Sequence, residues 1–363
     1  MGGPHQVGIV GLGVISGAYL ETLAGHPALR IAAVADLDES RARSAASAID
    51  GCRPMSTAAL VADPSIGTVL NLTVPAAHAE VALAAISHGT DVFGEKPLAA
   101  TFADAERVVE AAQAAGVRLG CAPDTVLGTG VQTARAAVDD GRIGRPVGAT
   151  ATWVSPGHEH WHPAPDFYYR EGGGPLLDMG PYYLTSLVQL LGPVVAVSGA
   201  ASRAHAERTI ATGPRAGDTV PVDVDTHVVG VLEHADGAIS SVTMSFDAVA
   251  SSARPLEVYG TNGALVVPDP NTHGGEVSMR RTGDETWTVL PPSAGYVDAG
   301  RGIGLLDFVA GHDRASGAMG LHVLEVMEAL HRAAAHGTRE VLSTTVEPPA
   351  RVPLTALRDW REG

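Results

Sequence analysis

The feature that most constrains the fold is the alternation of apolar runs with helical segments over about the first 120 residues. The apolar runs are rich in β-branched residues and show no alternation with polar residues, which is typical of strands buried on both faces. This pattern predicts a doubly wound α/β domain with a parallel sheet. The predicted strands are residues 5–11, 29–36, 66–74, 91–97 and 117–123, and the predicted helices are residues 17–25, 38–49, 76–89 and 101–116.

The rest of the chain has a different pattern. Repeated β-like runs separated by polar turns lie between about residues 194 and 290, and they predict a large, mainly antiparallel open sheet. A strand is predicted at 146–155, helices at 125–141, 174–192 and 323–337, and a long functional loop at 155–175. Since 363 residues exceed one ordinary core, we predict two domains. These are residues 1–122, with the parallel sheet, and residues 123–363, an α/β domain with the open sheet.

A glycine-rich turn joins the first predicted strand to the first predicted helix, and it reads Gly11-x-Gly13-x-x-Ser16. Gly11 permits a tight turn, and Gly13 lets the backbone approach a pyrophosphate, whose charge is favoured at a helix N-terminus. Ser16 stands where this pattern usually has glycine or alanine. In its context between strand and helix, the turn predicts a dinucleotide site.

Asp36 ends the second predicted strand, 23 residues after Gly13. A carboxylate at this position can accept both hydroxyls of an adenosine ribose, and it repels a 2′-phosphate. We therefore predict NAD rather than NADP as the cofactor. Arg41 and Arg43 leave some room for NADP, although they fall inside the next predicted helix.

Composition excludes several classes of protein. With 24 basic and 40 acidic residues the formal net charge is −16, which argues against nucleic acid and anionic membranes as partners. Apolar runs of about 18 residues, which could span a bilayer, are missing from the sequence. Two cysteines and the lack of a basic N-terminal leader predict a cytoplasmic protein without a disulfide framework or signal peptide.

The basic residues contain one anomaly: 23 of the 24 are arginine, and Lys96 is the one lysine. Arginine stays protonated in proteins, whereas a lysine can lose its proton when it is desolvated. A coding bias could leave a single lysine by accident. Its position directly after a predicted strand, in Glu95-Lys96-Pro97, favours a site that needs a compact ammonium group.

Three segments together resemble the glucose–fructose oxidoreductase / inositol dehydrogenase / rhizopine-catabolism (Gfo/Idh/MocA) family. They are Glu95-Lys96-Pro97, Val74-Pro75-Ala-Ala-His78 and Gly172-Gly173-Gly174-Pro-Leu-Leu-Asp178-Met-Gly, and the resemblance extends to residues 257–265 and 321–330. It implies a Rossmann domain followed by an α/β domain with a large open sheet. It also implies NAD(P)-dependent oxidation or reduction of a sugar or cyclitol hydroxyl, and a homodimer or homotetramer formed through the C-terminal sheet.

The resemblance also implies catalytic residues. It places Lys96 close to the nicotinamide and the substrate. Family members typically present Asp-x-x-x-His on one helix, and here the run has Asp178 and Tyr182, which share a helix face at this spacing. A tyrosine hydroxyl can shuttle a proton when a neighbouring ammonium stabilises its phenolate, and Lys96 is the candidate neighbour. Asp178 would orient Lys96 or bind substrate. The alternative is that Tyr182 and Tyr183 only pack.

The segment after residue 121 departs from the family, since Asp124 and Val126 stand in place of an Asn-x-Arg-type pattern. Asp124 would take the asparagine's role near the nicotinamide ribose, and Val126 indicates a remodelled substrate pocket. The residues expected to hold the cofactor are Gly11, Gly13, Val14, Ile15, Asp36, Leu72, Thr73, Val74, Pro75, His78, Glu95, Lys96 and Asp124.

A histidine-rich segment, His158-Glu159-His160-Trp161-His162, matches the zinc-protease pattern H-E-x-x-H. That chemistry requires a helix, which the flanking prolines disfavour, so we predict no metal site. A loop over a polyol substrate fits better, with exposed loop histidines as the alternative. The predicted substrate-binding residues are Lys96, His160, Trp161, His162, Asp178 and Tyr182.

The leading functional prediction is an NAD(P)-dependent sugar or cyclitol dehydrogenase, or the reverse ketoreductase. One alternative is a catalytically silent NAD-sensing regulator on the same fold. Another is an enzyme that keeps NAD bound and uses transient oxidation to drive elimination or glycoside cleavage.

Overall fold

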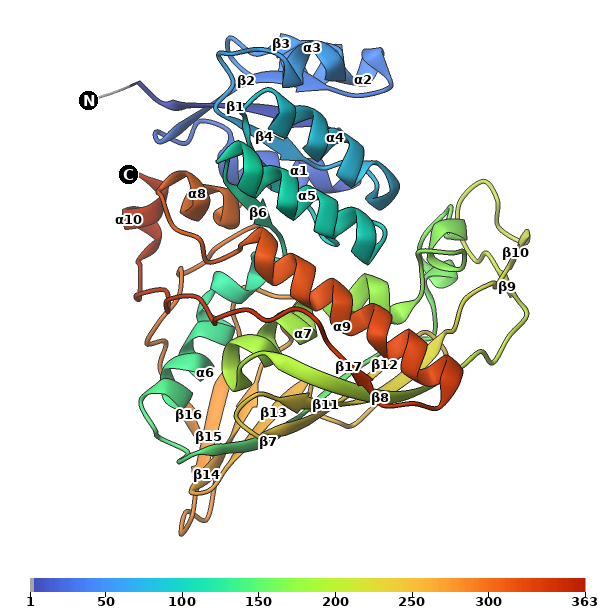
Figure 1. The fold of residues 1–363 in the computed structure, drawn as a ribbon, viewed down its shortest axis with the longest axis vertical. Coiled ribbons are helices and arrows are strands. Elements are labelled where there is room, and N and C mark those ends of the chain that lie inside the picture. Colours follow the sequence, from blue (N-terminus) through green and yellow to red (C-terminus); the bar gives the residue numbers. More distant parts are fainter. Residues whose placement is uncertain (1–2, 363) are drawn as a thin grey trace. The chain divides into compact units, whose positions relative to one another are not determined.

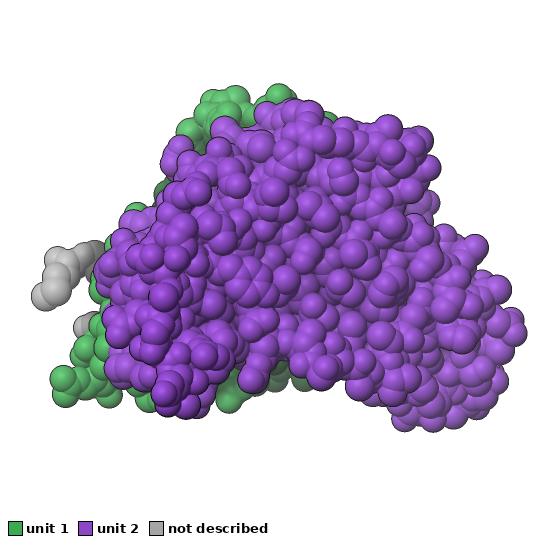
Figure 2. Space-filling model, turned by 90° about the horizontal axis from the view of Figure 1, so that it is seen from below, with its two compact units in different colours: residues 1–129, 294–324, 352–363 green, residues 130–293, 325–351 purple. Residues whose placement is uncertain are grey.

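The computed structural model describes residues 3–362, and the chain divides into two compact units. Unit 1 contains residues 1–129, 294–324 and 352–363, and unit 2 contains residues 130–293 and 325–351 (Figure 2). The compact units differ from the predicted limits because two late segments of the chain pack in unit 1. The predicted domains, residues 1–122 and 123–363, therefore stay a prediction.

Unit 1 is built on a parallel sheet, which has six strands within residues 3–362, in the order β3-β2-β1-β4-β5-β6. The strands are β1 (His5–Val10), β2 (Leu29–Ala35), β3 (Arg53–Pro54), β4 (Thr68–Asn71), β5 (Asp91–Gly94) and β6 (Leu119–Cys121). From β1 the order runs outward through β2 on one side and through β4 on the other. This confirms the doubly wound sheet, and such sheets bind ligands at the carboxyl ends of the strands where the order reverses.

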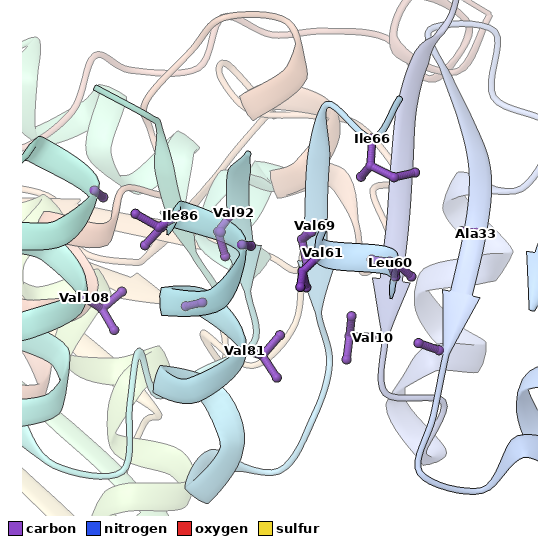
Figure 3. Close-up of a cluster of buried hydrophobic side chains, with 14 of the residues drawn as sticks. Val10, Ala33, Leu60, Val61, Ile66, Val69, Val81, Ile86, Val92 and Val108 are labelled. Atoms are coloured by element: carbon purple, nitrogen blue, oxygen red, sulfur yellow. The ribbon is translucent and has the colours of Figure 1, made fainter. Parts of the chain in front are cut away.

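Helices pack against the parallel sheet and bury an apolar core. Figure 3 shows Val10, Val69 and Val92 from the strands with Val81 and Val108 from the helices, all of them buried. Thr101 is the N-cap of α5, because its hydroxyl accepts the backbone N–H of Asp104. The helices of unit 1 are α1 (Val14–Leu23), α2 (Glu39–Ser47), α3 (Thr57–Val61), α4 (Pro75–Ser87), α5 (Phe102–Ala115), α8 (Ile303–Val309) and α10 (Leu357–Arg361).

Unit 2 is built on a larger sheet, with nine strands among the described residues, in the order β16-β15-β14-β13-β7-β12-β11-β8-β17. Its pairs are antiparallel except for β7 with β12, which confirms the predicted large, mainly antiparallel sheet. The strands are β7 (Pro146–Val154), β8 (Val194–Ser202), β11 (His227–His234), β12 (Ile239–Ser245), β13 (Leu256–Gly260), β14 (Gly263–Val267), β15 (Val277–Arg281), β16 (Thr288–Leu290) and β17 (Glu340–Val341). A separate ribbon pairs β9 (Glu207–Thr209) with β10 (Thr219–Pro221).

Helices cover one face of the large sheet. They are α6 (Thr129–Asp139), α7 (Pro175–Leu191) and the part of α9 (Gly317–His336) from residue 325 onward, and Figure 1 shows α7 and α9 along the strands. Gly230 lies under Leu330 of α9, because a Cβ there would be only 2.4 Å from the Leu330 side chain. On the opposite face Val229, Val231 and Ile239 are exposed. Among the described residues, no helix combines the length and apolarity that crossing a membrane requires.

Candidate active site

The glycine turn after β1 is shaped for a close backbone approach. Gly11 has φ +93°, and a Cβ there would lie 2.7 Å from the carbonyl carbon of Leu72, so the loops after β1 and β4 touch. Gly13 begins α1 without a side-chain cap, and a Cβ at Gly13 would meet no heavy atom within 4 Å. The Ser16 N–H donates to the Gly13 carbonyl, and the N–H groups of Val14 and Ile15 at the N-terminus of α1 suit an anion.

Asp36, at the end of β2, is turned toward the glycine turn. One carboxylate oxygen accepts the backbone N–H of Leu12 at 2.7 Å, and the other accepts that of Asp38 at 2.9 Å. The guanidinium of Arg41 lies 3.7 Å from the carboxylate, whereas Arg43 pairs with a glutamate of its own helix. The two backbone bonds fix the Asp36 carboxylate beside the turn.

The loop after β4 is organised by buried polar residues. The Asn71 side chain accepts the N–H and hydroxyl of Thr73 and donates to the carbonyl of His78. His78 is 2% exposed, and its ring nitrogens lie 2.6 Å from the Pro97 carbonyl and 2.9 Å from the Thr73 carbonyl. Burial lowers the pKa of His78 despite these carbonyls. His78 therefore braces the loop, and no motif in the sequence had indicated Asn71 as its organiser.

The other predicted residues of this loop differ in exposure. Leu72 is buried, whereas Val74 is 67% exposed, and Pro75 is the first residue of α4. Val14, at the start of α1, is also exposed, and Ile15 follows it with partial burial. The exposed positions thus gather around the glycine turn and the loop that touches it.

Glu95 and Lys96 follow β5 directly. Glu95 is buried, and its carboxylate accepts the hydroxyl of Tyr19 at 2.8 Å and the backbone N–H of Lys96 at 3.0 Å. Burial and then the Glu95 charge raise the pKa of Tyr19 well above its ordinary value. Lys96 is half-buried and precedes Pro97 through a cis peptide bond. The Glu95 carboxylate therefore holds the backbone of Lys96 in place through this hydrogen bond.

Asp124 is fully buried. One carboxylate oxygen accepts the backbone N–H groups of Gly302 at 2.7 Å and Gly304 at 3.1 Å, at the start of α8. The side chain thus anchors a late segment of the chain within unit 1. This placement gives Asp124 a scaffolding contact, and it has no exposed surface for a nicotinamide ribose.

Asp178 and Tyr182 lie on α7 at the predicted spacing of one helical turn, with Asp178 in the first turn. The Asp178 side chain is 20% exposed, and Tyr182 is 5% exposed. Tyr183 has a different environment, because its hydroxyl donates to Asp269 at 2.9 Å. Burial, followed by the Asp269 charge, raises the pKa of Tyr183. The two neighbouring tyrosines are therefore distinguishable, because the Tyr183 hydroxyl is bound to Asp269.

His158 contacts a predicted site residue, Asp178, and the sequence interpretation did not foresee this contact. Its Nε2 lies 2.9 Å from a carboxylate oxygen of Asp178, and the indole N–H of Trp161 donates to its Nδ1 at 3.1 Å. His158 is buried against the rings of Tyr168 and Phe246, with centroid distances of 4.2 and 4.5 Å. His158 and Asp178 are 20 residues apart, in a 3₁₀ turn (His158–His160) and in α7, so periodicity offered no sign of this pair.

The remaining residues of the histidine-rich segment separate. The Glu159 carboxylate is buried and accepts from the Arg208 guanidinium at 2.9 Å and from the Tyr169 hydroxyl. Trp161 is 57% exposed, His160 is exposed, and His162 is partly exposed. Within residues 3–362, no group of three or more His, Cys, Asp or Glu side chains is arranged to hold a metal ion.

Both halves of the chain match known protein families. Residues 5–122 match the oxidoreductase family with an NAD-binding Rossmann fold, and residues 131–266 match the GFO/IDH/MocA C-terminal domain. A 1,5-anhydro-D-fructose reductase from Ensifer adhaerens is 30% identical, over 66% of this chain and 69% of that protein. A myo-inositol 2-dehydrogenase from Thermotoga maritima is 28% identical, over 72% of this chain and 74% of that protein.

Solved structures share the fold. A levoglucosan dehydrogenase in complex with NADH and levoglucosan superposes with a TM-score of 0.77 at 22% identity, covering 94% of this chain and all of that one. An NAD-binding oxidoreductase from Klebsiella pneumoniae gives the same TM-score and identity, with 95% and 99% coverage. The chain therefore belongs to the GFO/IDH/MocA family of oxidoreductases, and its N-terminal part is the family's NAD-binding Rossmann domain.

Proposed function

We propose that this protein is an NAD-dependent oxidoreductase that acts on a CH–OH group of a sugar, sugar derivative or cyclitol. The observation that carries the proposal is the Asp36 carboxylate bonded to the glycine turn at the N-terminus of α1. This arrangement suits an adenosine ribose beside a pyrophosphate. Relatives named for anhydrofructose, myo-inositol and levoglucosan support the substrate class.

The residues around the glycine turn fit the cofactor, since Gly11 leaves no space for a side chain and Gly13 leaves open space. The backbone N–H groups of Val14 and Ile15 at the start of α1 would hold the pyrophosphate, and Asp36 would accept the ribose hydroxyls. The Asp36 charge repels a 2′-phosphate, so NAD is preferred over NADP, with Arg41 softening that preference. When bound, NAD supplies the hydride acceptor and NADH the hydride donor.

Three side chains perform the proton and charge chemistry in this proposal. The Tyr182 phenolate would take the proton of the reacting hydroxyl in oxidation, and the resulting phenol would return it in reduction. The Lys96 ammonium stabilises the negative charge that develops on the same oxygen. Asp178 accepts a hydrogen bond from a second substrate hydroxyl. Glu95 contributes by holding the Lys96 backbone in place.

The exposed part of the histidine-rich segment contributes to substrate binding. Trp161 is 57% exposed and offers an apolar ring face, which suits the C–H face of a sugar ring. His160 and His162 offer hydrogen bonds to its hydroxyls. Both histidines lie near Trp161 in sequence, and His162 stacks edge-on against it at a centroid distance of 5.3 Å.

We further propose that copies of the chain associate through the open face of the large sheet. Val229 and Val231 of β11 and Ile239 of β12 are 39, 45 and 56% exposed on the face opposite Leu330. Contiguous exposed apolar strands of this kind mark protein interfaces. A second copy of the chain with the same face would cover these residues. Light scattering measures the molar mass in solution, and we expect an oligomer for the wild type and weaker association for a Val231→Lys variant. A monomeric wild type contradicts this proposal.

A substrate panel tests the enzymatic proposal. We expect NAD-dependent turnover of at least one of myo-inositol, levoglucosan and 1,5-anhydro-D-fructose, the last with NADH, measured by the absorbance of reduced nicotinamide. Tyr182→Phe should lower turnover by about 100-fold or more, the size of a general acid–base contribution. Tyr183→Phe is the matched control and should keep turnover near that of the wild type.

Three other outcomes would contradict parts of the proposed function. Nucleotide binding without turnover across the panel would contradict an enzyme of this substrate class and favour the silent regulator. Cofactor that copurifies and needs no replenishment would favour transient oxidation. An equal loss in the Tyr182→Phe and Tyr183→Phe variants would remove Tyr182 from the proposed chemistry.

A further inference from the structure

His158 links an exposed aromatic ring to a carboxylate of the proposed site. Trp161 is 57% exposed, whereas the His158 side chain is 8% exposed and the Asp178 side chain 20%. The order of contacts is Trp161 Nε1 to His158 Nδ1, then His158 Nε2 to Asp178, at 3.1 and 2.9 Å. These three side chains therefore form one hydrogen-bonded series within unit 2.

Donor chemistry fixes the direction of both hydrogen bonds. An indole N–H is a donor only, so Nδ1 of His158 must be the acceptor and carries no proton. The ring proton then resides on Nε2, which donates to the Asp178 carboxylate. An imidazolium would have protons on both nitrogens and could not accept from Trp161. The contacts therefore select the neutral Nε2–H tautomer and leave the negative charge on Asp178.

Packing holds the imidazole in place. Its ring lies 4.2 Å from the ring centroid of Tyr168, 4.5 Å from that of Phe246 and 5.1 Å from that of Trp161. A carboxylate has a broad torsional minimum about its last bond, so it needs a fixed donor to adopt one orientation. A donor that is itself immobilised by aromatic rings supplies this constraint.

We propose that His158 is a positioning residue that orients Asp178 for a substrate hydroxyl, with Trp161 keeping Nδ1 of His158 unprotonated. This inference rests on the proposed function, because it assigns His158 a role through Asp178. Trp161 thereby acts in two ways, since a sugar ring that packs on the exposed indole shifts the group that keeps Nδ1 of His158 unprotonated. Substrate contact at the surface is thus coupled to the orientation of a carboxylate beneath it.

Nitrogen NMR of the protein labelled with ¹⁵N-histidine tests the tautomer without a substrate. The His158 signal is assigned by its loss in His158→Gln. We expect the Nε2–H pattern in the wild type at neutral pH. In Trp161→Phe, which keeps an aromatic ring but removes the donor, we expect a proton on Nδ1 as well in part of the molecules, because the Asp178 carboxylate still holds the proton on Nε2. A wild-type imidazolium, an Nδ1–H tautomer, or a signal unchanged in Trp161→Phe overturns the inference.

Kinetics test the positioning role in a double-mutant cycle with the best substrate of the panel. His158→Leu should lower kcat by about 10- to 100-fold, the size of a lost hydrogen bond to a charged group. In the Asp178→Asn background it should have little further effect, because coupled residues are not additive. His158→Gln should recover part of kcat, since its amide can donate from near the Nε2 position. Exposed His205 provides the matched control, His205→Gln, which should change nothing.

The outcomes separate this inference from the function on which it rests. Normal turnover in Asp178→Asn removes Asp178 from the proposed site, and the positioning role falls with it. If Asp178→Asn lowers kcat while His158→Leu leaves kcat normal, the positioning role of His158 is overturned and the proposed function stands. Equal losses from His158→Leu in both backgrounds show a purely structural histidine and also overturn it. Unchanged NADH binding in every variant confirms that the changes arise in unit 2.

Discussion

Replacing Arg208 with methionine should destabilise unit 2 strongly. The Arg208 side chain is 6% exposed, and its guanidinium donates to Glu159, to Asp247 and to the carbonyls of Pro156 and Phe246. The Glu159 and Asp247 side chains are only 4 and 11% exposed. Methionine keeps the apolar length of the side chain but leaves both carboxylates without their cation.

The size of the effect follows from this burial. Removing one partner of a buried ion pair costs about 3–5 kcal/mol, because the remaining charge stays desolvated. Unit 2 contains roughly 190 residues, and domains of this size lose about 2–4 °C in Tm per kcal/mol. Arg208→Met should therefore lower the Tm of unit 2 by about 6–20 °C. Turnover should fall as well, because the same ion pair holds the segment that carries His158.

Scanning calorimetry measures the shift, and Arg351→Met provides the control. Arg351 also lies in unit 2 and pairs with Asp140 at 3.0 Å, but its side chain is 37% exposed. Exposed pairs contribute at most about 1 kcal/mol, so its loss should lower Tm by no more than about 4 °C. Equal shifts in the two variants would refute the argument from burial.

Two further predictions concern the cofactor turn and pH. Gly11→Ala should weaken NADH binding by at least about 10-fold and also destabilise unit 1, because its Cβ meets the Leu72 backbone and φ is positive. Gly13→Ala should weaken binding without that loss of stability, as NADH titration and melting curves would show. Burial would raise the pKa of Glu325, but hydrogen bonds from Ser343 and Thr344 outweigh burial and lower it. Its stabilisation is then present above the ordinary pKa of 4.5 and is lost as pH falls through the lower folded value. Glu325→Gln should be less stable than the wild type at pH 7 and nearly equal to it below that value, as denaturation at several pH values would show.

The first half of the fold was predictable because its strands are buried on both faces. Continuous apolar runs such as residues 66–74 contain β4 (Thr68–Asn71), and the glycine turn at Gly11 and Gly13 indicated that a helix follows the first strand. The missed elements are short or polar: β3 is Arg53–Pro54, and both residues are exposed. Helix α8 (Ile303–Val309) has no polar cap side chain, so the usual start signal was missing.

The contacts of the site were harder to predict because they join residues far apart in sequence. Asp178 and Tyr182 lie on one helix, and their spacing alone indicated a shared face. The partner of Asp178 comes from a 3₁₀ turn 20 residues earlier, and that of Glu159 lies 49 residues later. The family resemblance implied a cofactor role for Asp124, and the structure shows its buried carboxylate accepting the N–H groups of Gly302 and Gly304, about 180 residues later. No local pattern encodes contacts of this range.

Isotope transfer tests the central claim most directly. The best alcohol substrate, deuterated at the reacting carbon, is incubated with NAD and either the wild type or Lys96→Arg, and the nicotinamide product is analysed by mass spectrometry. We expect deuterium in the NADH formed by the wild type. Lys96→Arg should bind NAD normally yet form almost no product, because a planar guanidinium is bulkier and does not replace a compact ammonium beside the reacting oxygen. Deuterium transfer at the wild-type rate by Lys96→Arg, or unlabelled NADH from the wild type, would contradict the proposed chemistry.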